Sequence, residues 1–337
     1  MKSVIINCIM FLSVFSMAKN IQIKTIERVT KDYREAAYTP LMQNSFTSEK
    51  DLKKIVKVIP PVPEGINRQE ILVKNNKDNL EISLYIYRPK NSQNKSLPIV
   101  YYTHGGGYLM RLALYDYNSY QNMADILDAA VITPKYRLST EAAFPAALED
   151  VYLGLEFLSK NAANYNLDSS RIILMGDSAG GGLATSLALY NRDNANIKLL
   201  GQVLIYPMLD SRTGSKKSLY ASRITGEICW NGSTNNFAWE KLKGNKKISE
   251  EMLSYFSPAQ AKNLTNLPPT FIYVGELDLF VNENLTYASK LIEAGVSTEL
   301  CLVKGLYHAF NIANPEGIQT REFWNKIYER TNDMLNN

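Results

Sequence analysis

The sequence feature that most constrains the fold is the segment Gly-Asp-Ser-Ala-Gly-Gly at residues 176–181. Four β-forming residues (172–175) run into this segment, and a helix-compatible stretch (183–189) follows it. A serine between glycines at a strand-to-helix turn is typical of the nucleophile elbow, in which the serine adopts a strained backbone conformation and its hydroxyl stands clear of the sheet. A G-x-S-x-G pattern also arises by chance in loops, but the strand before it and the helix after it favour a nucleophile at Ser178.

The chain from Leu97 onward alternates strand and helix patterns, which is typical of a sheet with crossover helices on its faces. Two earlier strands, 70–74 and 80–87, separated by a polar turn at 75–79, predict a hairpin. We expect further strands at 99–103, 130–136, 172–175, 202–206, 270–274 and 299–303. We expect helices at 117–128, 145–160, 179–190, 283–294 and 318–335.

The first 18 residues differ in composition from the rest of the chain. Lys2 precedes an apolar stretch (4–17), and Ser16 and Ala18 place small residues at the two positions that a signal peptidase recognises. The stretch is too short to span a bilayer comfortably, because a spanning helix needs about 20 residues. We therefore predict a signal peptide at 1–18 that is cleaved near Ala18, with export to the periplasm or the medium, in preference to an uncleaved anchor or a buried helix.

Two segments interrupt the alternating pattern and divide the chain. Residues 19–60 carry apolar positions at helical spacing and run into a proline-rich stretch (60–63), which predicts an N-terminal helical segment. Residues 209–262 are polar and too long for a simple connection, which predicts an insertion of the lid or binding type. The core then comprises 61–208 and 263–337, and the two segments together can form a cap over the mouth of the sheet.

Four aromatic residues in the insertion allow two interpretations. They can form a wall against a substrate or a small core of the insertion itself, and both interpretations stay open. The four residues are Trp230, Phe237, Trp239 and Tyr255.

The charge, the missing motifs and the few histidines and cysteines argue against several classes of function. The net charge of +4 over 337 residues is small and dispersed, so nucleic acid is not an expected partner. The two histidines are too far apart for a HExxH zinc site, and no P-loop or dinucleotide fingerprint occurs, so we expect no metal and no cofactor. Cleavage would remove Cys8 and leave Cys229 and Cys301; Cys301 falls in a predicted strand and is expected to be a small buried residue, and a bridge between the two stays open.

A nucleophilic serine needs a base, and only His104 and His308 can supply an imidazole. His308 lies in a loop directly after the last predicted strand, where sites gather in open α/β folds, and we expect it to be the base. His104 instead opens the segment His-Gly-Gly-Gly at 104–107. Glycines at the end of a strand let backbone N–H groups point into a cavity, as an oxyanion hole requires, so we expect His104 to shape this loop.

The third member of such a site is an acid that orients the imidazole. The expected order for this arrangement is serine, acid, histidine along the chain, and the segment after the strand at 270–274 offers Glu276 and Asp278. We favour Asp278 as the acid and expect Glu276 to support the site from outside. Asp177, in the elbow itself, is expected to make structural hydrogen bonds.

Together these motifs resemble the hormone-sensitive lipase family of α/β-hydrolases over about residues 60–335. The matching segments are His-Gly-Gly-Gly at 104–107, Tyr-Arg-Leu at 136–138, Phe-Pro-Ala-Ala-Leu-Glu-Asp at 144–150, Gly-Asp-Ser-Ala-Gly-Gly at 176–181 and Tyr-Pro-Met-Leu-Asp at 206–210, with Asp278 and His308 after them. The resemblance implies an α/β-hydrolase fold, with a mostly parallel, twisted sheet of about eight strands, helices on both faces and a helical cap.

The resemblance also implies roles for six residues. Ser178 would be the nucleophile, His308 the base and Asp278 the orienting acid. The backbone N–H groups of Gly105, Gly106 and Ala179 would form the oxyanion hole.

The chain departs from the family pattern at two places. Residues 136–141 read Tyr-Arg-Leu-Ser-Thr-Glu where the family has Tyr-Arg-Leu-Ala-Pro-Glu, and residues 278–283 read Asp-Leu-Phe-Val-Asn-Glu where it has Asp-Pro-Leu-Arg-Asp-Glu. The acid is kept, so the departures bear on substrate fit more than on the reaction.

The function implied by the resemblance is hydrolysis of small-molecule carboxylic esters with short to medium acyl chains, through an acyl-enzyme on Ser178. A binding protein on the same scaffold is the alternative from another class, since the gibberellin receptors resemble this family without the triad histidine. The presence of His308 argues against that alternative. A lyase that uses the same triad on a β-hydroxy ketone stays open, as do the natural ester and the oligomeric state.

Overall fold

The computed structural model describes residues 22–43, 45–58, 68–75, 80–92, 95–111, 117–220 and 222–336. The predicted signal peptide with its cleavage site and Cys8 lies outside the described residues, as do the proline-rich stretch 60–63 and most of the predicted hairpin turn. Among the described residues, no helix combines the length and the apolar character that crossing a membrane requires.

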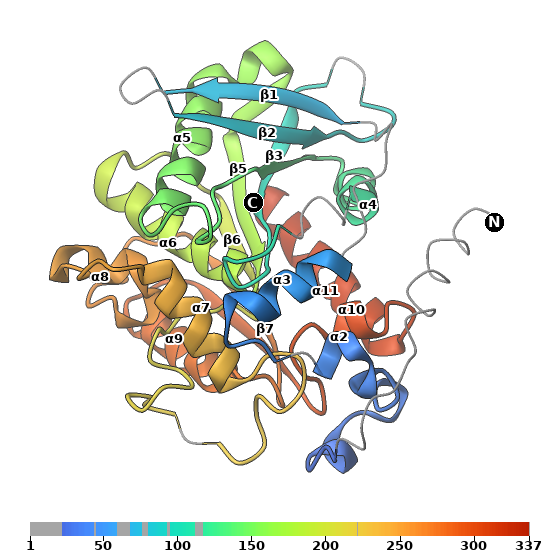
Figure 1. Ribbon diagram of the computed structural model, residues 1–337. Helices are drawn as coiled ribbons and strands as arrows, with labels where there is room; N and C mark the ends of the chain where they lie inside the picture. Colours follow the sequence, from blue (N-terminus) through green and yellow to red (C-terminus); the bar gives the residue numbers. More distant parts are fainter. Residues whose placement is uncertain are drawn as a thin grey trace.

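An eight-stranded sheet forms the centre of the molecule (Figure 1), with the order β1-β2-β4-β3-β5-β6-β7-β8. The strands β1 and β2 form an antiparallel hairpin, β2 pairs antiparallel with β4, and all later pairs are parallel. The strands are β1 (Gln69–Lys74), β2 (Glu81–Tyr87), β3 (Leu97–Thr103), β4 (Ala130–Pro134), β5 (Leu167–Asp177), β6 (Gly201–Ile205), β7 (Thr270–Gly275) and β8 (Thr298–Val303). The prediction of a mostly parallel sheet of about eight strands is therefore confirmed.

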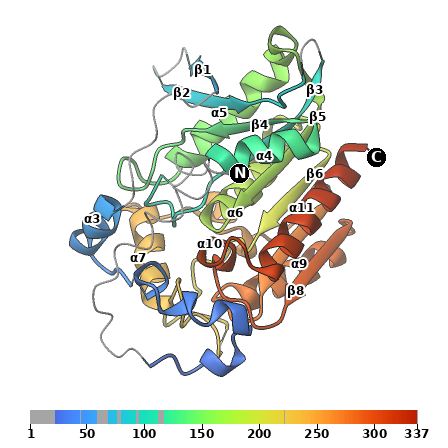
Figure 2. The ribbon, with the colours of Figure 1, turned by 90° about the vertical axis from the view of Figure 1, so that its right-hand side faces the viewer.

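Helices cover both faces of the sheet (Figures 1 and 2). On one face, α5 (Ala146–Asn161), α6 (Ala179–Asn194) and α9 (Val281–Glu293) contribute to one apolar core. On the other face, α4 (Tyr117–Leu127) and α11 (Ile318–Asn336) contribute to a second core. Consecutive residues of one strand point to opposite faces of the sheet and enter different cores, as Ile172 and Ile173 of β5 do. Because both faces are buried, the central strands are continuous apolar runs.

Two of the predicted details differ in the structure. The strand β4 ends at Pro134 rather than at residue 136, because Tyr136 turns inward and its hydroxyl donates to the carbonyl of His104 (2.7 Å). Cys301 is half-buried rather than buried, because β8 is an edge strand of the sheet. Cys229 and Cys301 are both free thiols.

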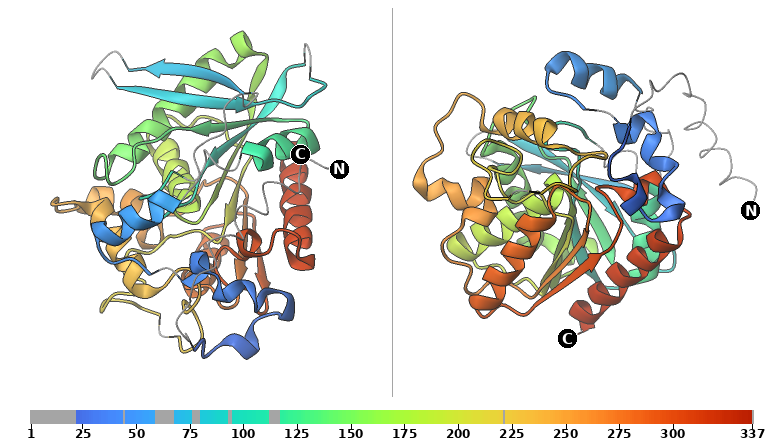
Figure 3. Two further views of the ribbon diagram at one scale, coloured as in Figure 1. Left: turned by 45° about the vertical axis from the view of Figure 1, so that its right-hand side comes forward. Right: turned by 90° about the horizontal axis from the view of Figure 1, so that it is seen from below.

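The N-terminal segment and the 209–262 segment lie side by side at one end of the molecule (Figure 3). The first contains three short 3-10 turns (Ile26–Arg28, Lys31–Tyr33 and Ala36–Tyr38), α2 (Pro40–Gln43) and α3 (Glu49–Val58). The second contains α7 (Gly232–Lys243), α8 (Glu250–Phe256) and the 3-10 turn Pro258–Gln260. The Glu227 carboxylate accepts hydrogen bonds from the N–H groups of Lys24 and Thr25, and the ring of Phe46 packs edge-on against Trp230.

Two further structured stretches complete the described residues. A 3-10 turn (Ala162–Tyr165) joins α5 to β5, and the short helix α10 (Phe310–Ala313) directly follows the loop that carries His308.

Candidate active site

Ser178 lies at the sharp turn between β5 and α6. Its backbone has φ 54° and ψ −122°, which a non-glycine residue adopts only under strain, and its N–H donates to the carbonyl of Ile205 (2.9 Å). A Cβ at Gly180 would overlap the carbonyl oxygens of Thr103 and His104, so only glycine lets the new helix pass this close to β3. The sequence pattern and the local backbone agree on a nucleophile elbow.

The structure brings Ser178, His308 and Asp278 together in a chain of hydrogen bonds. The Ser178 Oγ lies 2.9 Å from His308 Nε2, and His308 Nδ1 lies 2.7 Å from Asp278 Oδ2. An ionised carboxylate only accepts, so Nδ1–H donates to Asp278 and Nε2 is left to accept the proton of the serine hydroxyl. The other carboxylate oxygen of Asp278 accepts the N–H of Phe280 (2.8 Å), which fixes the acid in place.

The loop that carries His308 is held from three sides. The rings of Tyr206 and Phe280 pack edge-on against the imidazole, with centroids 4.7 and 5.1 Å away. Glu276, the other acid in the same segment, does not touch the imidazole; its carboxylate accepts the N–H of Gly305 (3.0 Å). Glu276 therefore anchors the start of the loop that presents His308.

The structure contradicts the expectation that the N–H of Gly105 is an oxyanion donor. Its N–H donates to Asp177 Oδ1 (2.9 Å), and this same oxygen also accepts the Tyr102 hydroxyl (3.0 Å). An N–H that already donates to a buried carboxylate is not free for a substrate oxygen, so the prediction for Gly105 is wrong. Burial raises the pKa of Asp177, and the residue makes the structural hydrogen bonds that its position predicts.

Gly106 and Gly107 follow with φ of +115° and +63°, a backbone that favours glycine. A Cβ at Gly107 would overlap the indole of Trp230. Within the part of the chain that the structure describes, the N–H groups of Gly106, Gly107 and Ala179 have no acceptor. The sequence did not lead us to single out the N–H of Gly107, although the third glycine of the run was the available signal.

His104 is buried beside this glycine loop and carries a single ring proton at neutral pH. Its Nδ1 donates to the carbonyl of Gly105 (2.7 Å), and its ring stacks on Tyr136 with centroids 4.4 Å apart. Burial lowers the pKa of His104 to about 3. The imidazole is therefore neutral and shapes the loop.

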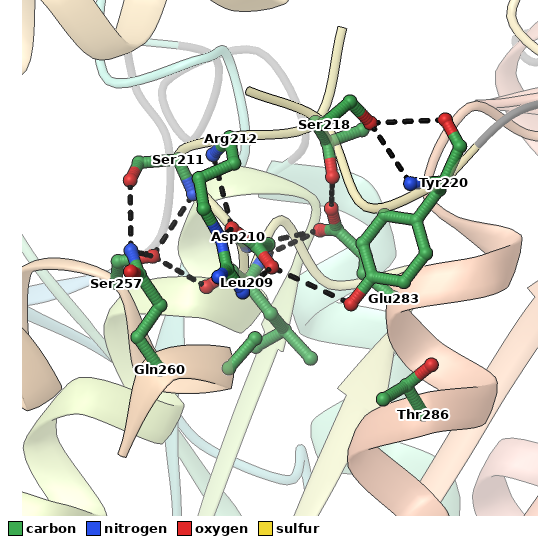
Figure 4. A network of polar contacts seen from close by, with 12 residues as sticks. Leu209, Asp210, Ser211, Arg212, Ser218, Tyr220, Ser257, Gln260, Glu283 and Thr286 are labelled. Carbon is green, nitrogen blue, oxygen red and sulfur yellow. Dashed lines mark hydrogen bonds and ion pairs between the residues drawn. The ribbon is translucent and has the colours of Figure 1, made fainter. Parts of the chain in front are cut away.

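A second buried carboxylate, Glu283, ties α9 to the start of the 209–262 segment (Figure 4). It accepts the N–H of Leu209 (2.6 Å) and of Asp210 (3.3 Å), together with the Thr213 hydroxyl. Burial raises the pKa of Glu283 well above its usual range. Beside it, the Asp210 carboxylate binds the guanidinium of Arg212 (2.7 Å). The sequence reasoning did not single out Glu283, because nothing in a helical pattern marks one glutamate as buried.

The four aromatic residues of the insertion divide between the two interpretations. Trp239 packs edge-on against Phe256 of α8, and Tyr255 packs edge-on against Tyr190 of α6, so these residues stabilise the insertion and its contact with the core. Trp230 instead lies between the glycine loop and His308, with its ring centroid 6.2 Å from that of the imidazole. Phe237 contacts Phe46 of the N-terminal segment.

Among the described residues, no group of three His, Cys, Asp or Glu side chains is arranged to hold a metal ion. The chemistry that the site offers on its own is a hydroxyl hydrogen-bonded to an imidazole, with free backbone N–H groups beside it. Such an arrangement can add the hydroxyl to a carbonyl carbon.

Comparison with known proteins agrees with this fold. A family model described as alpha/beta hydrolase fold matches residues 100–312. The chain is 29% identical over 301 residues to a putative alpha/beta hydrolase, R526, of Acanthamoeba polyphaga mimivirus, covering 85% of this chain and 84% of that protein. It is 31% identical over 234 residues to carboxylesterase NlhH of Mycobacterium tuberculosis, covering 68% and 71%. The solved structure of a bacterial heroin esterase superposes with a TM-score of 0.81 at 24% identity, covering 93% of this chain and all of that one, which shows a shared fold.

Proposed function

The chain belongs to the alpha/beta hydrolase fold family, and we propose that this carboxylic ester hydrolase acts through an acyl-enzyme on Ser178, with His308 as base and Asp278 as orienting acid. The observation that carries the proposal is the pair of hydrogen bonds from Ser178 Oγ to His308 Nε2 and from His308 Nδ1 to Asp278. The motifs at 104–107 and 176–181 further support a place in the hormone-sensitive lipase group and short to medium acyl chains.

In the first step, Ser178 Oγ attacks the ester carbonyl while His308 Nε2 takes its proton. Asp278 stabilises the imidazolium that forms and keeps Nε2 aimed at the serine. The N–H groups of Gly106, Gly107 and Ala179 are the donors we assign to the developing oxyanion, since they have no acceptor among the described residues.

Collapse of the tetrahedral intermediate breaks the bond to the alcohol, which leaves with the proton from His308. Water then enters, His308 takes one of its protons, and the resulting hydroxide adds to the acyl carbon. The second collapse releases the acid and returns the proton to Ser178. Every proton transfer passes through Nε2, so the mechanism needs no cofactor.

The experiment uses purified wild type and Ser178→Ala with p-nitrophenyl acetate and a fluorophosphonate probe. We expect turnover and labelling of the wild type, and loss of both in Ser178→Ala. Ser159→Ala, a serine on α5 that donates only to the carbonyl of Glu156, is the matched control and should keep both activities.

Labelling or turnover that survives Ser178→Ala would show that another residue is the nucleophile. Absence of both activities in a folded wild-type protein would favour a binding protein on this scaffold.

A further inference from the structure

Trp230 occupies a position that no catalytic role requires. It lies just before α7, at the point where the 209–262 segment passes over the glycine loop, and only 5% of its surface is exposed. The Cη2 edge of the indole stands where a Cβ of Gly107 would be. The ring is therefore in direct contact with the loop that carries the free N–H groups.

The indole is held in this position from two directions. Its Nε1 donates to Asn235 Oδ1 (3.0 Å), and the buried Asn235 in turn donates to the carbonyl of Thr213 (2.7 Å). The ring of Phe46, from the N-terminal segment, packs edge-on against the other side with centroids 5.6 Å apart. A ring fixed by a buried hydrogen bond and an aromatic neighbour cannot move aside without breaking both contacts.

The orientation of a bound ester follows from the proposed mechanism. The alcohol oxygen must face His308 Nε2, which protonates it, and the carbonyl oxygen must face the N–H groups of the glycine loop. The acyl group is the remaining substituent, and we place it beside the glycine loop, where the indole packs on Gly107. Ser178 and His308 are only 5% and 4% exposed, so neighbouring side chains largely cover the reacting groups.

We propose that Trp230 is a specificity-determining residue that restricts the acid part of the ester to acetyl and similarly small acyl groups. The proposal rests on the proposed esterase function and names its substrate class. It depends on an indole packed onto the third glycine of the loop.

The test compares wild type, Trp230→Phe and Trp230→Ala on p-nitrophenyl acetate, butyrate and octanoate. We expect the wild type to prefer acetate, and the ratio of kcat/KM for octanoate to that for acetate to rise about tenfold or more in Trp230→Ala. Trp230→Phe, which keeps an aromatic ring, should fall between the two. Trp324→Ala on α11, where the ring stacks on Tyr328, is the matched control and should leave the ratio unchanged.

Thermal melting of each variant checks that it is folded. Wild type that hydrolyses octanoate faster than acetate would overturn the proposal, as would an unchanged ratio in folded Trp230→Ala and Trp230→Phe. With 1-naphthyl acetate as a further substrate, a change in Trp230→Ala confined to this acetate of a larger alcohol would also overturn it, because the indole would then face the alcohol. All three results differ from failure of the esterase function itself, in which the wild type would not hydrolyse acetate at all.

Discussion

The two histidines of the chain lie in two loops that leave parallel strands of one sheet, yet the group that accepts the hydrogen bond from Nδ1 differs between them. His104 follows β3, and its Nδ1 donates to a backbone carbonyl while its ring stacks on Tyr136. His308 follows β8, and its Nδ1 donates to the buried carboxylate of Asp278. Both side chains are buried, so burial does not distinguish them.

The comparison shows that the partner of Nδ1 decides what a buried imidazole can do. A carbonyl fixes the tautomer of His104 but offers no charge to balance a second proton, and burial lowers its pKa to about 3. A carboxylate fixes the tautomer of His308 and, in the proposed mechanism, also stabilises the imidazolium that proton transfer creates. The predictions below test this contrast, from the largest expected effect to the smallest.

Replacing each histidine by glutamine should separate the two roles most strongly. For His308→Gln we expect kcat on p-nitrophenyl acetate to fall by about 10⁴-fold or more, because no group remains to take the serine proton. His104→Gln should cause a far smaller loss, since that side chain only shapes the loop. Equal losses of kcat in the two folded variants would show that the two histidines do not differ in their roles.

The two carboxylates of the site provide the next contrast. Asp278→Asn should lower kcat by about 10⁴-fold, because an amide can donate to Nδ1 and so stabilise the wrong tautomer of His308. Asp177→Asn keeps an oxygen that accepts the N–H of Gly105 and the Tyr102 hydroxyl, so its effect should be much smaller. Steady-state kinetics on one ester, with circular dichroism to check folding, measures both.

The glycine loop can be tested without touching either histidine. Gly107→Ala introduces a Cβ that overlaps Trp230 at a residue with φ +63°, so the loop must shift and its N–H groups move with it. Loss of one oxyanion donor typically costs about 10²–10³-fold in kcat, and we expect a decrease in that range. A decrease in kcat with little change in KM would support the role in the transition state; an unchanged kcat would remove Gly107 from the oxyanion hole.

The smallest effect concerns stability rather than turnover. Because the pKa of His104 is about 3 when folded and near 6.5 when unfolded, the unfolded state binds an extra proton between these values, and stability is lost as the pH falls through this window. Denaturant unfolding of wild type and His104→Asn from pH 7 to pH 4 should show a pH slope that is steeper in the wild type by roughly 1 kcal/mol per pH unit. Parallel curves would show that His104 takes up its proton in the folded state.

Much of the fold follows from sequence patterns, because a sheet buried on both faces requires continuous apolar strands and each strand-to-helix alternation is local. The elbow at Ser178 is equally local, since two glycines and a strand-helix junction define it. In the sequence, Asp278 could be favoured over Glu276 only by its place in the chain. In the structure, Asp278 contacts His308, whereas Glu276 accepts the N–H of Gly305.

The choice of donors in the glycine loop is where pattern reasoning failed. Three consecutive glycines look alike in a sequence. Only the packing of β3 against the elbow shows that the N–H of Gly105 donates to the carboxylate of Asp177. Glu283 escaped notice for a related reason, because its burial depends on the path of the 209–262 segment over α9.

The sequence by itself determined the order of strands and helices, the elbow and the identity of the only two imidazoles, since each depends on residue type and short-range spacing. Tertiary structure decided which N–H groups stay free, which imidazole meets a carboxylate, and that Trp230 lies against Gly107. Those outcomes depend on contacts between residues that are far apart in the chain, and hydrogen-bond partners over such separations are set by packing rather than by local preference.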